Sequence, residues 1–162
     1  MRGMQEPEQV NWLGTVYRIL LPSGPNSSLS IFESMDQPGY GPPRHIHKCE
    51  DETFYVISGE VEFWLDRETV HHGPGDVVFI ERGKEHTFRV TGEMPARMLT
   101  IMTPGGFEGF FPEMAKGRYR IPQDMQKIAE IGARYNLEFT GPPLGHDTRP
   151  PLRESAMMSE TT

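Results

Sequence analysis

The amino-acid sequence predicts an all-β fold, a single sandwich or barrel followed by one or two helices. Short apolar runs recur about every ten residues with turn-forming residues between them, a spacing typical of sandwiches and barrels. The chain of 162 residues contains 17 Gly and 15 Pro, which favours a turn-rich β fold over a helical bundle. The length is that of one domain, and no internal repeat indicates a second.

The predicted strands follow one another through the first two thirds of the chain. Each is a short run of apolar and β-branched residues that ends at Gly, Pro, Asn or Asp, the residues that favour turns. The expected strands cover residues 16–21, 28–35, 44–48, 53–58, 61–65, 76–80, 86–90 and 96–102. Between two of them, residues 71–75 (HHGPG) are expected to form a turn.

The sequence changes character after Pro104. Residues 106–116 contain three phenylalanines and are expected to form a short helix, and residues 122–135 repeat apolar side chains at roughly helical spacing. We therefore expect one or two helices to pack on the barrel. The predicted organisation is a flexible N-terminus (1–10), a β-barrel (11–104), a helical extension (105–144) and a flexible tail (145–162).

Composition and charge exclude several classes of partner. The net charge is −7 and the basic residues are scattered, so we expect no nucleic-acid partner, because phosphate binding needs concentrated positive charge. No apolar run reaches the length of about 18 residues that a membrane span needs. Cys49 is the single cysteine, which excludes an intrachain disulfide and suits a reducing compartment. The first residues lack the apolar core of a signal peptide, so a cytoplasmic location is expected.

Two histidines stand one residue apart in the expected strand 44–48. Residues two apart in a strand face the same side, so His45 and His47 project together and are able to share one cation. On this pattern alone, an ordinary pair of strand histidines is the favoured interpretation.

Glu52 changes that balance. It lies five residues after His47, an odd separation that would place it on the other face of a continuous strand, but the polar segment 48–51 is expected to turn. Glu52 then begins the next strand on the same face as Phe54, where a carboxylate is costly to bury unless it is paired or bound to metal. His86 begins a later strand and is a fourth candidate ligand.

Two motifs carry a family resemblance. Residues 39–59 follow the pattern G(x)5HxH(x)4E(x)6G, which resembles the first cupin motif at every fixed position, and residues 75–86 follow G(x)7G(x)2H, which resembles the core of the second. Glu81 stands where the second motif usually has Pro, and Val90 where it usually has Asn. Neither of these positions is a metal ligand, and the apolar Val90 favours a hydrophobic substrate.

The resemblance implies a single-domain cupin, a conical double-stranded β-helix or jelly-roll barrel with one metal at its centre. The implied ligands are His45, His47, Glu52 and His86. Three imidazoles and one carboxylate suit a divalent first-row metal such as Fe, Mn, Ni, Cu or Zn, and the ligand types do not choose among these. In octahedral geometry, four protein ligands leave two positions for a substrate or for dioxygen.

Three further segments resemble small single-domain cupins of the quercetin-dioxygenase-like group. They are WLG at 12–14, TPGGFEGFFPEM at 103–114 and YNLEFTGPPL at 135–144. The resemblance implies a metal-dependent dioxygenase that cleaves a flavonol or another enolisable hydroxylated aromatic or polyketide-like small molecule, and it implies a homodimer. Glu52 is then either a plain fourth ligand or a ligand that also accepts the substrate proton.

Aromatic and apolar side chains are candidates for the substrate pocket. Phe54, Phe88 and Val90 share faces with the expected ligands, and Phe107 and Phe111 follow the barrel. The two latter residues either form a lid over a flat substrate or cap the barrel core, and the cap is the favoured interpretation.

Two other functions are compatible with the same residues. A metal-dependent cyclase or isomerase would use the site as a Lewis acid. A cupin that binds a small ligand without transforming it is the second alternative, although such a protein has less need of an intact set of metal ligands.

Overall fold

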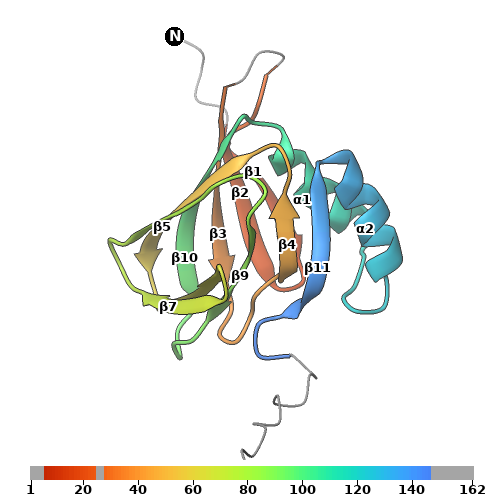
Figure 1. The fold of residues 1–162 in the computed structure, drawn as a ribbon. Coiled ribbons are helices and arrows are strands. Elements are labelled where there is room, and N and C mark those ends of the chain that lie inside the picture. Colours follow the sequence, from red (N-terminus) through yellow and green to blue (C-terminus); the bar gives the residue numbers. More distant parts are fainter. Residues whose placement is uncertain (1–5, 25–27, 147–162) are drawn as a thin grey trace, which may run out of the picture.

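The computed structural model of the chain describes residues 6–24 and 28–146. Two antiparallel sheets account for most of these residues, and two helices lie beside the barrel that the sheets enclose (Figure 1). The predicted all-β barrel with C-terminal helices is confirmed.

The first sheet has six strands, which pair in the order β1-β2-β3-β10-β5-β8. Their bounds are β1 (Glu8–Trp12), β2 (Thr15–Leu21), β3 (Ser30–Asp36), β10 (Ala96–Thr103), β5 (Asp51–Ser58) and β8 (Val77–Ile80). β3 and β5 both pair with β10, which therefore lies in the middle of the sheet.

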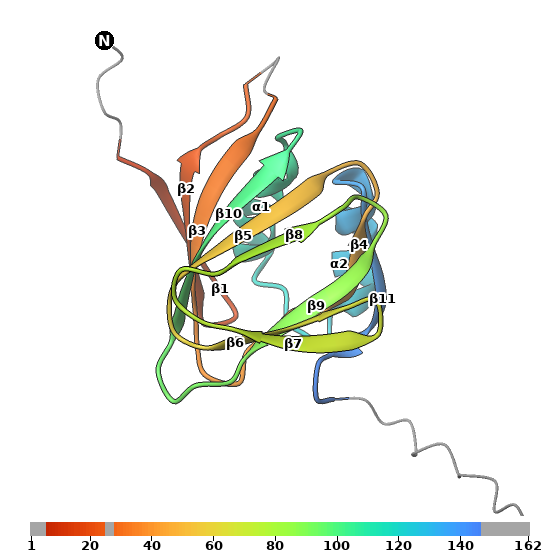
Figure 2. The same cartoon turned by 60° about the vertical axis from the view of Figure 1, so that its left-hand side comes forward.

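The second sheet has five strands, which pair in the order β11-β4-β9-β6-β7. Their bounds are β11 (Leu137–Pro143), β4 (Pro43–His47), β9 (Glu85–Val90), β6 (Val61–Leu65) and β7 (Glu68–His72). β4 and β6 belong to this sheet but β5 belongs to the other one, so the chain crosses between the sheets twice within residues 43–65 (Figure 2).

The two sheets pack face to face around a core of apolar side chains. Val56 and Met98 of the first sheet meet Val61 and Val90 of the second, and all four are at most 1 % exposed. Burial of such side chains stabilises the fold by about 1.5–3 kcal/mol each. We call this cluster the barrel core.

A second core joins the open end of the barrel to the helices. It is built around the 3-10 helix η1 (Phe107–Gly109), α1 (Phe110–Gly117) and α2 (Met125–Arg134). α1 contacts β1 and α2 contacts β11, and the ring of Phe111 stacks on Tyr17 of β2 with centroids 3.9 Å apart. Helices are thus present in both predicted segments, and α2 begins three residues after Pro122.

The N-terminal residues are more ordered than the sequence predicts. Residues 8–10 belong to β1 rather than to a flexible end, because Val10 and Trp12 alternate with exposed neighbours and are 7 % and 8 % exposed against the mouth of the barrel. Residues 1–5 and 147–162, which fall within the predicted flexible ends, lie outside the described residues.

Two other strands were not expected. Residues 137–143, placed by the prediction in a helical extension, form β11 along the edge of the second sheet, where Leu137 is the partner of His47. The register shifts near Gly141 and Pro143, residues that are tolerated at edges and bulges but disfavour a strand in sequence. His71 and His72 belong to β7 rather than to a turn, because they pair with β6.

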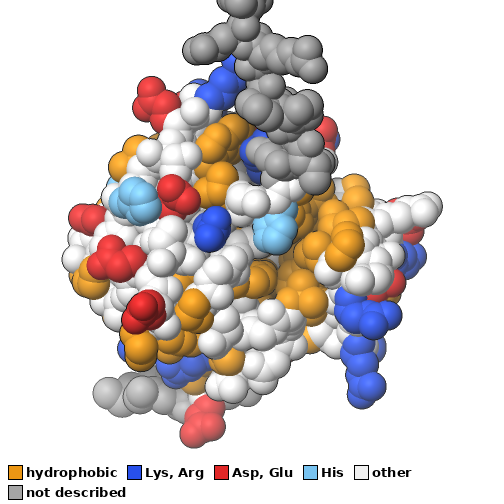
Figure 3. Space-filling view, turned by 90° about the horizontal axis from the view of Figure 1, so that it is seen from below, with side chains coloured by type: hydrophobic (Ala, Val, Ile, Leu, Met, Phe, Trp, Pro, Cys, Tyr) orange, Lys and Arg blue, Asp and Glu red, His pale blue; other side chains and the backbone are white. Residues whose placement is uncertain are grey.

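The surface carries mixed charges. In Figure 3, which looks at the lower end of the molecule of Figure 1, acidic, basic and hydrophobic side chains are interspersed. Among the described residues, neither helix combines the length and apolarity that a membrane span requires.

Candidate metal centre

The four predicted metal ligands meet between the two sheets. β4 contributes His45 and His47, the adjacent β9 contributes His86, and β5 of the opposite sheet contributes Glu52. One candidate ligand atom from each lies within 4.8 Å of those of the other three. The structure therefore brings together the whole set that the sequence predicts.

The topology explains this convergence. His45 and His86 are direct cross-strand partners, so their rings stand side by side. Residues 48–50 then carry the chain from β4 to β5, which lies in the other sheet. Because the two sheets face each other, Glu52 approaches the histidines from the opposite side. The odd number of residues from His47 to Glu52 therefore does not keep their side chains apart.

The cluster is closed to bulk solvent. His45, His47, Glu52 and His86 are 8 %, 2 %, 4 % and 1 % exposed. Nε2 of His86 lies 3.0 Å from Oε2 of Glu52, and Nε2 of His47 lies 3.5 Å from the same oxygen. The ring of Phe107 stands edge-on to His47 with centroids 4.4 Å apart. Packing against Phe107 and the contact with Glu52 hold His47, since its Nδ1 is buried with no hydrogen-bond partner among the described residues.

Backbone carbonyls orient the other two imidazoles. Nδ1 of His45 lies 2.8 Å from the carbonyl oxygen of Pro43, and Nδ1 of His86 lies 3.0 Å from that of Lys84. A carbonyl only accepts, so each Nδ1 carries the proton, and in a neutral ring Nε2 then presents a lone pair. In His86 that lone pair faces a carboxylate oxygen of Glu52, and two acceptors at this distance need a cation or a proton between them.

Burial governs protonation in the cluster. It lowers the pKa of His45 well below its ordinary value, helped by the neighbouring His86 and His47, and it lowers the pKa of His47 to about 4. Burial acts to raise the pKa of Glu52, but His47 and His86 reverse this, so the carboxyl stays ionised at neutral pH. A divalent transition metal binds unprotonated imidazoles and ionised carboxylates, and the lowered pKa values of His45, His47 and Glu52 favour those forms.

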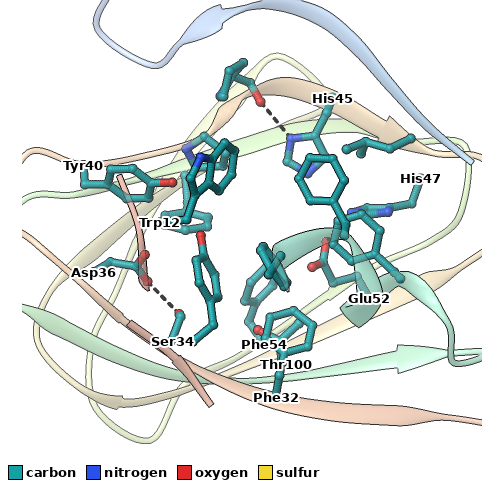
Figure 4. A pocket seen from close by; sticks show the side chains of 18 of the residues that line it. Trp12, Phe32, Ser34, Asp36, Tyr40, His45, His47, Glu52, Phe54 and Thr100 are labelled. Atoms are coloured by element: carbon teal, nitrogen blue, oxygen red, sulfur yellow. Dashed lines mark hydrogen bonds and ion pairs between the residues drawn. The ribbon is translucent and has the colours of Figure 1, made fainter. Parts of the chain in front are cut away.

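Three members of the cluster, His45, His47 and Glu52, line a cavity between the sheets (Figure 4), and His86 lies outside its lining. Half of the lining residues are Phe, Tyr or Trp, and aromatic side chains are usual in a small-molecule site. The predicted pocket residues that line it are Phe54, Phe88, Phe107 and Phe111. The two last also belong to the core beneath the helices, so they both cap the barrel and wall the cavity.

Val90 is placed differently from the prediction. It is 1 % exposed in the barrel core and is not among the residues that line the cavity. The alternation of β9 does put it on the same face as His86 and Phe88. It lies four residues beyond His86, however, and that distance along the strand takes it past the cavity into the packed interior.

Several lining residues were not predicted. They are Trp12, Tyr17, Phe32, Ser34, Asp36, Tyr40, Pro42, Pro43, Thr100, Phe110, Ile121, Leu137 and Phe139. A signal existed for part of this set: Phe32, Ser34 and Asp36 alternate along β3 and are all buried. A polar residue on the inner face of an apolar strand is the same feature that singles out Glu52.

Comparison with known proteins agrees with the fold and the motifs. Residues 32–102 match the family model of the cupin domain. The solved structure of KdgF from Halomonas sp. is similar with a TM-score of 0.56 at 18 % identity, covering 67 % of this chain and 96 % of that chain. This likeness shows the fold, the cupin double-stranded β-helix.

Two curated relatives match parts of the chain. Quercetin 2,3-dioxygenase of Bacillus subtilis (strain 168) is 31 % identical over 67 residues, which are 41 % of this chain and 20 % of that protein. Tetracenomycin polyketide synthase protein TcmJ of Streptomyces glaucescens is 25 % identical over 92 residues, 56 % of this chain and 62 % of that protein. The chain therefore spans less than two thirds of the length of either relative.

Proposed function

We propose that this chain, which belongs to the cupin superfamily, is a metal-dependent enzyme acting on a flat, hydroxylated aromatic small molecule such as a flavonol or an aromatic polyketide. One observation carries the proposal: three members of the buried cluster, His45, His47 and Glu52, line a cavity in which half of the lining residues are Phe, Tyr or Trp. A metal held there would meet any ring that the cavity admits.

The donor set suits one divalent transition metal. Nε2 of His45 and His86, a ring nitrogen of His47 and a carboxylate oxygen of Glu52 would hold Fe, Mn, Ni, Cu or Zn. Such a metal supplies Lewis acidity and open coordination positions. The carbonyls that fix His45 and His86 keep those imidazoles oriented, as outer partners commonly do around metals.

The protein's own groups would perform the remaining tasks. The aromatic walls exclude water and hold a flat ring against the cluster. Glu52 accepts the proton of a substrate hydroxyl, because its carboxylate oxygens are the ionised acceptors of the cluster and lie beside the histidines. The similarity to quercetin 2,3-dioxygenase supports dioxygen as the second substrate and ring cleavage as the reaction.

A second candidate is a cyclase or isomerase that consumes no dioxygen. The likeness to a solved cupin structure described as a sugar phosphate isomerase from Silicibacter pomeroyi supports it, with a TM-score of 0.51 at 26 % identity over 56 % of this chain and 59 % of that chain. The cavity and the cluster serve both reactions, since each needs a Lewis acid beside a flat, hydroxylated ring.

Assembly and location complete the proposal. The resemblance to cupins of this size supports a homodimer, which light scattering of the purified chain tests. The exposed, unpaired thiol of Cys49 suits the reducing conditions of the cytoplasm.

The test begins with elemental analysis of the protein purified without added metal. We expect about one transition metal per chain in the wild type and in the control Glu68→Ala, whose side chain is exposed on β7, and a loss of most of it in Glu52→Ala and His47→Ala. Full occupancy in the two latter variants would overturn the metal site.

Oxygen uptake with flavonols and other phenols then separates the reactions. Uptake that matches product formation supports the dioxygenase. Turnover under strict anaerobiosis supports the second candidate instead, and a ligand recovered unchanged in air identifies a binding protein.

A further inference from the structure

The cavity has a second polar end that the proposed chemistry leaves without a role. In Figure 4, Asp36, Ser34 and Tyr40 lie at one side of the cavity, while His45, His47 and Glu52 lie at the other. The side chain of Asp36 is 1 % exposed. A buried carboxylate at a cavity wall calls for an explanation, because removing its charge from water is costly.

Hydroxyl groups, rather than a cation, hold this carboxylate. Thr15 Oγ1 donates to Oδ1 of Asp36 at 3.0 Å, and Ser34 Oγ donates to Oδ2 at 2.6 Å. Burial raises the pKa of Asp36 to about 6, and the two hydroxyls offset only part of that rise. Each carboxylate oxygen accepts more than one hydrogen bond, so Asp36 keeps acceptor capacity after both are made.

Two phenols accompany the carboxylate. Tyr17 and Tyr40 line the same cavity and interact with each other through their hydroxyls. Burial raises the pKa of Tyr40 to about 12 and that of Tyr17 well above its ordinary value, and the charge of Asp36 raises both further. Both phenols therefore remain neutral and can donate as well as accept hydrogen bonds.

A run of aromatic rings links this end to the metal cluster. Tyr17 stacks on Phe111 with centroids 3.9 Å apart, Phe111 meets Phe107 at 5.5 Å, and Phe107 meets His47 at 4.4 Å. The wall between the two polar ends is thus apolar and built of ring faces and edges. Such a wall suits a flat aromatic body with polar groups at both ends.

We propose that Asp36, Tyr17 and Tyr40 form a second polar subsite, which binds a phenolic hydroxyl of an aromatic ligand at the end of the cavity opposite the metal cluster. In this subsite Asp36 accepts the hydrogen bond of the ligand hydroxyl, and Tyr40 donates to its oxygen. The inference deepens the proposed function and rests on its substrate class. It narrows that class to aromatics that carry a hydroxyl on the ring remote from the metal.

Phenol and anisole are suitable probes, because they differ in the hydroxyl proton that Asp36 would accept. Dissociation constants are measured by NMR titration of the full-length, isotope-labelled protein. We expect phenol to bind about tenfold more tightly than anisole and to shift the backbone amides of Thr15 and Ser34. A hydrogen bond to a buried charged acceptor accounts for a preference of this size.

Variants assign the preference to the subsite. Asp36→Asn is nearly isosteric and should reduce the phenol-to-anisole ratio several-fold, and Tyr40→Phe should reduce it in the same direction. The controls are Asp66→Asn, an exposed carboxylate, and Tyr55→Phe, a 43 % exposed phenol, which should leave the ratio unchanged. Equal affinity for the two probes, absence of saturable phenol binding, or an unchanged ratio in both cavity variants overturns the subsite.

The binding experiment distinguishes failure of the subsite from failure of the proposed metal-dependent function. Glu52→Ala should lose metal but retain the preference for phenol, because Asp36 is held by Thr15 and Ser34 rather than by the cluster. A wild-type chain that holds no metal yet prefers phenol would overturn the metal-dependent reaction alone. A chain that holds metal but shows no preference would overturn the subsite alone.

Discussion

Replacing Asp36 with Asn should change how the stability of this protein depends on pH. The carboxyl is 1 % exposed, and burial raises its pKa in the folded protein to about 6 from an ordinary value of 3.8. The folded state therefore binds the proton more tightly than the unfolded state does. Stability from this group is fully present below the unfolded pKa and is lost as the pH rises to about 6.

The magnitude follows from the two pKa values. Each pKa unit corresponds to about 1.4 kcal/mol, so the rise from 3.8 to about 6 corresponds to about 3 kcal/mol. Asparagine does not titrate and avoids this loss. The free energy of unfolding of the wild type minus that of Asp36→Asn should accordingly fall by most of about 3 kcal/mol between pH 4 and pH 7.5.

Urea unfolding followed by tryptophan fluorescence at a series of pH values measures this difference. Other titrating groups are common to both proteins and cancel, so the difference isolates position 36. The matched control is Asp66→Asn, whose carboxylate is exposed, and its difference from the wild type should vary far less over the same range. A difference between wild type and Asp36→Asn that stays constant with pH would refute the assignment of a raised pKa to Asp36.

The remaining predictions concern packing, backbone and metal. Phe111→Ala should lower the free energy of unfolding by about 3–5 kcal/mol, measured by urea unfolding, because Phe111 is 7 % exposed within the core beneath the helices. Gly41→Ala should be strongly destabilising, since a Cβ there would lie 1.9 Å from the carbonyl oxygen of Phe88. The control is Gly24→Ala, where no heavy atom of the described residues, its chain neighbours aside, lies within 4 Å of the added Cβ. Equal melting temperatures of the two variants would contradict the reasoning. Chelation of the metal should lower the melting temperature of the wild type but not that of Glu52→Ala, and equal shifts in both would show that the stabilising metal is bound elsewhere.

The parts of the site that could be predicted are those set by local spacing. His45 and His47 share a face in any strand, and the polar segment after them forces the turn that returns Glu52 to the same interior. Asp36 was accessible by the same reasoning, because it alternates with Ser34 on the inner face of β3. It was missed because no motif marks it, whereas the metal ligands fall in register with known glycines.

The parts that could not be predicted depend on partners distant in sequence. β11 contains Gly141 and Pro143, which disfavour a strand. It is a strand only because it pairs with the edge of β4, which lies about 90 residues earlier in the sequence. β1 similarly depends on contacts of Trp12 with the C-terminal part of the chain. The Trp12 ring meets Phe110 of α1, and its indole nitrogen donates to the carbonyl oxygen of Tyr119, which follows α1, at 2.7 Å. Hydrophobic periodicity and residue propensity indicate which secondary structure a segment prefers. They do not indicate which distant strand edge or helix the segment packs against.

Glu52 and Asp36 are both buried carboxylates of the cavity, but the groups beside them differ and suit them to different ligands. Burial alone would raise the pKa of both carboxyls. Beside His47 and His86 the pKa of Glu52 is instead lowered, whereas hydroxyls hold Asp36 and leave its pKa raised to about 6. The carboxylate of Glu52 lies 3.0 Å from Nε2 of His86, a distance that needs a cation or a proton between the two atoms. A carboxylate facing hydroxyl donors already has its charge partly satisfied, so a further donor of the same kind, such as a ligand hydroxyl, is the group that it can still accept. The difference in surroundings therefore supports a cation at one end of the cavity and a phenol at the other.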